Sequence, residues 1–158
     1  MGKYLVIFIL LIAVVVGGYF MLAKQESGLV NKVAIQLPLA TAAPVSFGAN
    51  FEIYTNGTKR IFTDGKYHNL SPDVFIEASA PNIVQVRKPG VTWTNFFETL
   101  PMSLTKDCLV TGTKQTFCTD ATGELKFYLN DNEDKDALDR QINESDRLLV
   151  KYRSSSGP

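Results

Sequence analysis

Apolar residues form one unbroken run near the start of the chain and shorter, alternating groups after it. The run, residues 4–22, contains no charged side chain. As a helix it would span roughly 28 Å, close to the ~30 Å hydrocarbon core of a bilayer. It is longer than the apolar region of a cleaved signal peptide, and no A-x-A-like site follows it directly. The pattern predicts a single transmembrane helix that is retained as a signal-anchor.

The alternating groups predict a β-rich domain. Six segments with period-two patterning are expected to be strands: residues 51–55, 59–63, 74–78, 83–87, 125–129 and 146–152. Asn56-Gly57 lies between the first two and supplies the positive φ values of a tight hairpin turn. Pro81-Asn82 is expected to form the turn between the next two.

One segment changes to the helical period. Four large apolar side chains recur at the spacing i, i+3, i+4 and i+7: Trp93, Phe96, Phe97 and Leu100. Thr92 can cap the start of this short helix through its hydroxyl group, and Pro101 stops it. Because a two-turn helix is not stable alone, we expect these four residues to form a core helix packed on the sheet. An aromatic platform for a ligand is the alternative interpretation of the same rings.

The two cysteines flank a candidate hairpin centred on Thr113. Folding the segment there places Cys108 opposite Cys118, and facing Cα atoms of an antiparallel pair are within disulfide range. We therefore predict a structural disulfide in an exported, oxidising setting. A redox-active pair usually has C-x-x-C spacing, which is absent here. Two cysteines and one histidine do not supply the four ligands of a structural zinc site.

The charge balance of the chain mainly argues against one class of partner. The chain carries 16 basic and 16 acidic side chains, and the part beyond Lys24 is slightly acidic. Nucleic acid is therefore not an expected partner, because its recognition needs a basic face. Lys3 and the short N-terminal tail favour an orientation with the C-terminal domain outside the cytoplasm. The expected organisation is an anchor at 1–24, a stalk at 25–44, an exported domain at 45–153 and a tail at 154–158.

Candidate chemistry is sparse. Acidic residues gather in the segment 131–146, where calcium binding is one hypothesis and a solvated loop is the other. The EF-hand pattern is not met, because no glycine stands at its sixth position. His68 is the only histidine and is expected to be an exposed loop residue, with a catalytic role as the alternative. No nucleophile motif, phosphate loop or metal-ligand cluster is recognised, so we expect no enzyme activity, no metal site and no cofactor.

The order of predicted elements resembles the β-grasp (ubiquitin-like) arrangement, in which a mixed sheet wraps one helix. The segments FYLND at 127–131 and INESDRLLV at 142–150 are similar to a strand, acidic turn and strand pattern of that class. The phrase VTWTNFFETL at 91–100 is similar to the helix opening of transcobalamin-C-terminal-like and soluble-ligand-binding domains. Ser145 stands where the turn glycine of the pattern usually is. The resemblance implies an α+β fold, a small β-grasp-like domain following the transmembrane helix.

The expected function follows by elimination. A small disulfide-stapled domain on a single-pass anchor in the cell membrane fits an extracytoplasmic binding module. Its partner could be a protein, a glycan or a small molecule, and the sequence does not select among them. The alternative is a structural subunit of a membrane or cell-surface assembly whose anchor makes specific contacts.

Overall fold

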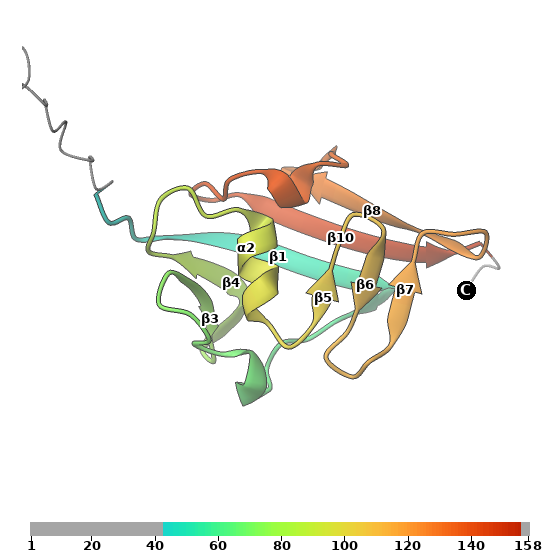
Figure 1. Cartoon of the computed structure of the whole chain (residues 1–158), viewed down its shortest axis with the longest axis horizontal. Helices are drawn as coiled ribbons and strands as arrows, with labels where there is room; N and C mark the ends of the chain where they lie inside the picture. Colours follow the sequence, from blue (N-terminus) through green and yellow to red (C-terminus); the bar gives the residue numbers. More distant parts are fainter. Residues whose placement is uncertain (1–42, 156–158) are drawn as a thin grey trace, which may run out of the picture. The chain divides into compact units, whose positions relative to one another are not determined.

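The computed structural model describes residues 43–155 of the 158-residue chain. They form a larger and a smaller β-sheet with one α-helix (Figure 1). In the larger sheet the spatial order of strands is β3 (Val74–Glu77), β4 (Ala80–Val86), β1 (Phe47–Thr55), β10 (Arg147–Ser154), β8 (Gly123–Leu129) and β9 (Asn132–Glu133). A short strand, β2 (Thr58–Lys59), also pairs with β1.

The centre of the larger sheet is a parallel pair formed by the first and last strands of the domain. β1 runs parallel to β10, which places Phe51 beside Leu148 and Ile53 beside Val150. β4 lies antiparallel to β1, and β8 lies antiparallel to β10. Because these four side chains are fully buried, the pairing of the first and last strands of the domain also builds the middle of the core.

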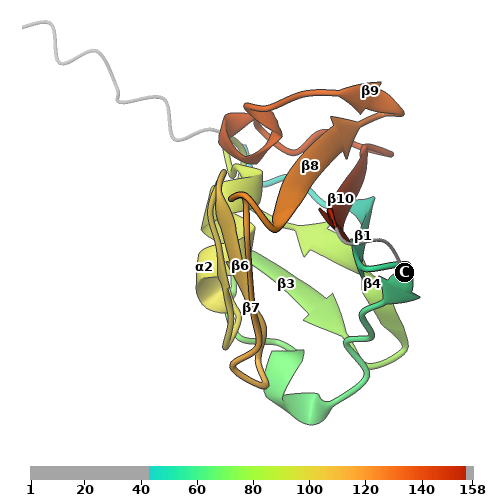
Figure 2. The same ribbon diagram turned by 90° about the vertical axis from the view of Figure 1, so that its right-hand side faces the viewer.

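The second layer covers one face of the larger sheet. It contains the helix α2 (Trp93–Thr99) and the smaller sheet, whose strand order is β5 (Ser103–Leu104), β6 (Cys108–Val110) and β7 (Thr116–Cys118). Figure 2 shows α2, β6 and β7 together on one side of β3, β4, β1 and β10. Two 3₁₀ turns, η1 (Gly65–Tyr67) and η2 (Ala137–Asp139), lie in the connections.

Helix α2 begins at a complete capping box. The hydroxyl oxygen of Thr92 accepts a hydrogen bond from the backbone N–H of Asn95, and the Asn95 side chain accepts one from the N–H of Thr92. The helix ends at Thr99, with Leu100 as its C-terminal cap immediately before Pro101. It directs its aromatic side chains at the larger sheet, where the Phe51 ring lies 5.1 Å from the Phe96 ring.

Two expected turns differ in detail from those observed. The Asn56-Gly57 turn forms with both residues at positive φ, but the returning strand β2 has only two residues, because the chain then turns inward and buries Phe62. The second turn was expected at Pro81-Asn82 and instead lies at residues 78–79, between Glu77 and Ala80. A register shift between Ile76 and Glu77 accompanies it, so Pro81 falls inside β4.

The fold class expected from the sequence needs correction. Among residues 43–155 no helix is long and apolar enough to cross a membrane, and α2 has only seven residues. Buried residues alternate along the long strands β1, β8 and β10, so each of these strands buries one face rather than its whole surface. The described part is mostly β-sheet, in two sheets rather than the single sheet expected. Residues 4–22, for which the transmembrane helix was predicted, lie outside the described residues.

Candidate functional site

A cavity of about 230 Å³ lies between the larger sheet and the smaller one. Segments distant in the sequence contribute to it: residues 59–62 after the first hairpin, Tyr67 of η1, Met102 after the helix, Leu109 of β6, and residues 111–113 in the β6–β7 turn. Figure 2 shows η1 and the β6–β7 turn at the same end of the domain, which agrees with this set of lining residues.

The inner surface of the cavity is apolar. We call it the floor, and it consists of Ile53, Phe62, Tyr67, Met102 and Leu109. Ile53 and Leu109 are completely buried, so the floor is continuous with the hydrophobic core. The rings of Phe62 and Tyr67 meet edge to face at 5.2 Å, a favourable arrangement for two aromatic side chains. The floor is therefore an apolar surface that includes a packed pair of rings.

The 3₁₀ turn η1 holds Tyr67 against the cavity. The Asp64 carboxylate caps this turn by accepting a hydrogen bond from the backbone N–H of Lys66, and this bond lowers the pKa of Asp64. His68 Nε2 lies 2.8 Å from the carbonyl oxygen of Phe62. Since a carbonyl oxygen can only accept, Nε2 carries the proton and donates. His68, expected to be an exposed loop residue, is half-buried and ties η1 to the floor.

The β6–β7 hairpin forms the opposite side. Thr111 closes its turn, because the Thr111 N–H donates to the carbonyl of Gln115 at 2.9 Å. The hydroxyl groups of Thr111 and Thr113 lie 3.0 Å apart. Gly112 is required by a close approach: a Cβ atom there would lie 2.2 Å from the Tyr67 hydroxyl oxygen. The two sides of the cavity thus meet at Gly112 and Tyr67.

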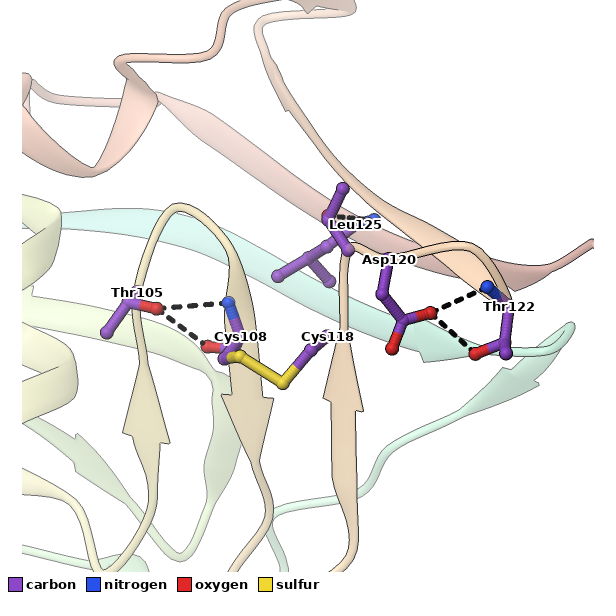
Figure 3. Close-up of a disulfide and its surroundings, with 7 residues drawn as sticks. Thr105, Cys108, Cys118, Asp120, Thr122 and Leu125 are labelled. Carbon is purple, nitrogen blue, oxygen red and sulfur yellow. Dashed lines mark hydrogen bonds between the residues drawn. A yellow bond between two sulfur atoms is a disulfide. The ribbon is translucent and has the colours of Figure 1, made fainter.

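The disulfide predicted from the sequence is confirmed, and it lies at the other end of this hairpin (Figure 3). Cys108 and Cys118 face each other across β6 and β7. The Thr105 hydroxyl accepts from the Cys108 N–H at 3.0 Å, which orders the turn into β6. At the far side, the Thr119 hydroxyl accepts from the Leu125 N–H at 2.9 Å and links the hairpin to β8. The bridge therefore stabilises a hairpin whose tip lines the cavity.

Two cationic residues, Lys59 and Arg60, are among the lining residues. The Lys59 ammonium forms an ion pair with Glu52, and this hydrogen bond lowers the pKa of Glu52 against the opposing effect of burial. Arg60 has neutral partners instead: its Nε donates to Thr55 Oγ1 at 2.7 Å, and its Nη1 donates to Gln115 Oε1 at 3.0 Å. Its guanidinium also stacks over the Phe117 ring at 5.1 Å. Within the described part of the chain, Arg60 has no carboxylate partner.

The aromatic residues predicted on the helix do not contribute to this cavity. Trp93, Phe96 and Phe97 are buried on α2, and Leu100 is buried at its C-terminal cap. The Trp93 indole N–H has no hydrogen-bond partner in the described structure, and we find no physical account of it. The placement of these rings agrees with core packing rather than a ligand platform.

The acidic segment 131–146 is divided among ion pairs. The Asp134 carboxylate accepts from Arg140 Nε at 2.9 Å, and this hydrogen bond lowers the pKa of Asp134. Asp136 and Asp139 both pair with Lys106, and the pKa of Lys106 is raised by these two hydrogen bonds. Over residues 43–155, no three of the histidine, cysteine, aspartate and glutamate side chains gather as metal ligands would.

Sequence reasoning did not find the cavity residues. Arg60, Tyr67 and Gly112 belong to three separate segments, and no local motif relates them. The one available signal is Gly112, a glycine directly before Thr113, where the hairpin was predicted to turn. No family model matches this chain, and no similar curated protein or solved structure is found.

Proposed function

We propose that the domain is a non-catalytic binding module on the outer side of the cell membrane, and that the cavity is its ligand site. The observation that carries the proposal is the combination of an apolar floor with Arg60, a lining residue whose guanidinium is held by neutral acceptors. Small-molecule sites are typically apolar hollows with a few placed polar groups. In this proposal the apolar segment 4–22 holds the module at the membrane.

The chemistry of the lining supports binding rather than catalysis. The hydroxyl groups of Thr111 and Thr113 lie beside each other and not beside a general base. His68, the one histidine of the chain, uses Nε2 to hold the Phe62 carbonyl. A lining of this kind can retain a ligand, but it offers no group placed to activate one.

The disulfide supports an extracytoplasmic location, because such bonds persist in oxidising compartments and are rare in the cytosol. The test is thiol alkylation in acid-quenched cells that express the full chain. We expect no alkylation of Cys108 and Cys118 unless a reductant is added first. A chain with Leu11 and Val14 both replaced by Asp, which interrupts the apolar segment, should show free thiols. Free thiols in the unaltered chain would contradict the proposed location.

Kinship with exported ubiquitin-like ligand-binding domains is a further part of the proposal. It is supported by the parallel pairing of β1 with β10 at the centre of the sheet and by a single helix on one face. Two features depart from the pattern expected for that class. Ser145 replaces the turn glycine, and the smaller sheet β5–β6–β7 is added beside α2.

Binding at the cavity is tested by titrating the full chain in mild detergent with anionic, neutral and cationic small molecules of one ring each. We expect at least one probe to shift amide signals of the lining residues. The same probe should fail with Gly112→Ala, because the added Cβ displaces the Tyr67 ring. If no probe binds, or if Gly112→Ala binds as the unaltered chain does, the cavity is not the site.

The second candidate function is a subunit of a membrane or cell-surface assembly. It is favoured by the outer face of the larger sheet, which no described element covers in Figure 2. Tyr54, Tyr128 and Leu149 lie on that face and are only half-buried. In this case a partner should co-purify with the full chain, and Leu149→Glu should release it while Gly112→Ala should not.

A further inference from the structure

We infer that the cavity binds a small organic carboxylate with an apolar body. The carboxylate would meet the Arg60 guanidinium, and a ring or branched chain would lie on the floor. This inference rests on the proposed function and adds the chemical class of the ligand. It is carried by three observations, which concern the partners of Arg60, the charges of the lining and the hydroxyl group of Tyr67.

Arg60 is fixed in place but not neutralised. Its backbone N–H donates to the Ile53 carbonyl at 2.8 Å, and its side chain donates to Thr55 and Gln115, both neutral acceptors. These bonds use two of the five guanidinium N–H groups, so three stay available. A guanidinium held by neutral acceptors and stacked on a ring is prepared for a planar anion, because its fork matches the two oxygens of a carboxylate.

The lining of this cavity has cations and no carboxylate among the described residues. Lys59 and Arg60 are its only charged side chains in that part of the chain. Four other hollows on the domain each include at least one acidic residue: Asp73 in one, Asp139 in another, Glu133 in a third and Glu52 in the fourth. A carboxylate ligand would be repelled less at this cavity than at those four hollows, and an organic cation would be disfavoured there.

Tyr67 provides the second polar contact. Its side chain is 8% exposed and it lines the cavity, yet its hydroxyl group has no hydrogen-bond partner in the described structure. Trp93 Nε1 is the only fully buried side-chain polar atom without a partner among the described residues, so the Tyr67 hydroxyl group keeps contact with solvent and is accessible to an acceptor atom of a ligand. A carboxylate oxygen is such an acceptor. The same residue contributes its ring to the floor, so one side chain contacts both ends of the ligand.

The size of the cavity limits the ligand. At ~30 Å³ per water molecule, about 230 Å³ corresponds to roughly eight water molecules. Covalently linked atoms pack more tightly than water, so a ligand of about eight to twelve non-hydrogen atoms fits. That range covers a single ring or a branched chain carrying one carboxylate. A nucleotide or an oligosaccharide would extend beyond a hollow of this volume.

The test is isothermal titration calorimetry on the full chain in mild detergent. The probes are 3-phenylpropionate, its neutral amide, the corresponding amine and inorganic phosphate. We expect the carboxylate to bind about tenfold or more tightly than the amide, because a charge-assisted hydrogen bond is lost in the amide. The amine and phosphate should not bind, since one lacks the anion and the other lacks the apolar body.

Substitutions test whether Arg60 and Tyr67 are the side chains that bind the carboxylate. Arg60→Gln should weaken 3-phenylpropionate binding about tenfold or more, and Tyr67→Phe should weaken it several-fold. Arg87→Gln is the matched control, because Arg87 stacks over Phe75 at 5.0 Å but does not line the cavity. Its affinity should equal that of the unaltered chain. If Arg60→Gln does not fold, Arg60→Lys replaces it in the test. We expect Arg60→Lys to bind 3-phenylpropionate more weakly than the unaltered chain, because lysine lacks the planar fork of the guanidinium.

These experiments distinguish failure of the carboxylate assignment from failure of the proposed function, in which the cavity is a ligand site. Equal binding of carboxylate and amide, blocked by Gly112→Ala, would leave the cavity a ligand site and overturn the carboxylate assignment. Carboxylate affinity unchanged in Arg60→Gln, or lowered to the same degree in Arg87→Gln, would also overturn it. Absence of binding by all four probes would overturn the assignment as well. The broader titration with neutral and cationic molecules would then decide whether the cavity is a site at all.

Discussion

At the scale of single residues, Ser145 is a position where the sequence departs from what the backbone needs. Its φ is 65°, a left-handed conformation that favours glycine. The Ser145 N–H donates to the Gly48 carbonyl at 3.0 Å, so the conformation is held by the neighbouring strand. This explains why the sequence pattern placed a glycine here, and why a serine can stand in its place.

We expect Ser145→Gly to raise the free energy of unfolding by about 1 kcal/mol, because the left-handed strain is removed. Urea denaturation measures the change. Asn130→Gly is the matched comparison, since Asn130 also has positive φ but its side chain donates to Asp146 at 2.8 Å and accepts from the Arg147 N–H. That variant should lose stability. A loss of stability in Ser145→Gly would show that the serine side chain has a role of its own.

At the scale of elements, the sequence pattern predicted those helices and hairpins that depend on interactions between residues close together in the chain. The cysteine pair could be assigned because its hairpin is short and its facing residues follow from folding the segment at Thr113. Helix α2 was predicted because large apolar side chains recur at the helical spacing between Thr92 and Pro101, which mark its boundaries. The length of β2 could not be predicted, because it depends on where Phe62 enters the core and not on the residues of the turn.

The disulfide should matter most for the hairpin that lines the cavity. Replacing both Cys108 and Cys118 with serine is expected to lower the free energy of unfolding by about 2–3 kcal/mol, because a closed loop of this length no longer restricts the unfolded chain. Urea denaturation gives the value, and the reduced unaltered chain should match the variant. Signals of Thr111 and Thr113 should broaden or shift first. Unchanged stability would show that the hairpin is held by its strand pairing alone.

At the scale of the whole molecule, pairings between strands far apart in the sequence determine the strand order and the position of the cavity. The strand order depends on β1 meeting β10, two segments at opposite ends of the domain, and no local pattern contains that information. The cavity has the same origin, since Arg60, Met102 and Gly112 come together only after both sheets have formed. Sequence reasoning therefore recovered several elements and the disulfide but neither the second sheet nor the candidate site.

The charges of the surface predict how stability responds to acid. The pKa values of Glu52, Asp64, Asp120 and Asp134 are lowered, mainly by hydrogen bonds from Lys59, the Lys66 N–H, Thr122 and Arg140 respectively. A carboxylate whose pKa is lowered on folding stabilises the fold above its unfolded value and loses that effect as pH falls through its folded value. Because the ordinary values are 3.8 for Asp and 4.5 for Glu, stability should decline below about pH 4.

Urea midpoints measured from pH 3 to pH 8 check this dependence. The midpoint should be nearly constant from about pH 6 to pH 8 and should fall progressively toward pH 3, because protonation of these carboxylates removes their bonds in the folded state. High salt should reduce the ion-pair part of the change, since these groups are exposed. A midpoint that rises toward pH 3 would contradict the assignment of these contacts.

The central claim is that the cavity between the two sheets is the ligand site, and intermolecular NOEs test it most directly. The chain is labelled with ¹³C at methyl groups and mixed with 3-phenylpropionate in excess. Ring protons of the probe should give NOEs to the methyl groups of Ile53, Met102 and Leu109, which belong to the floor. Leu149 lies on the opposite face of the sheet and should give none. NOEs to Leu149 without NOEs to the floor would contradict the account and move the site to the outer face.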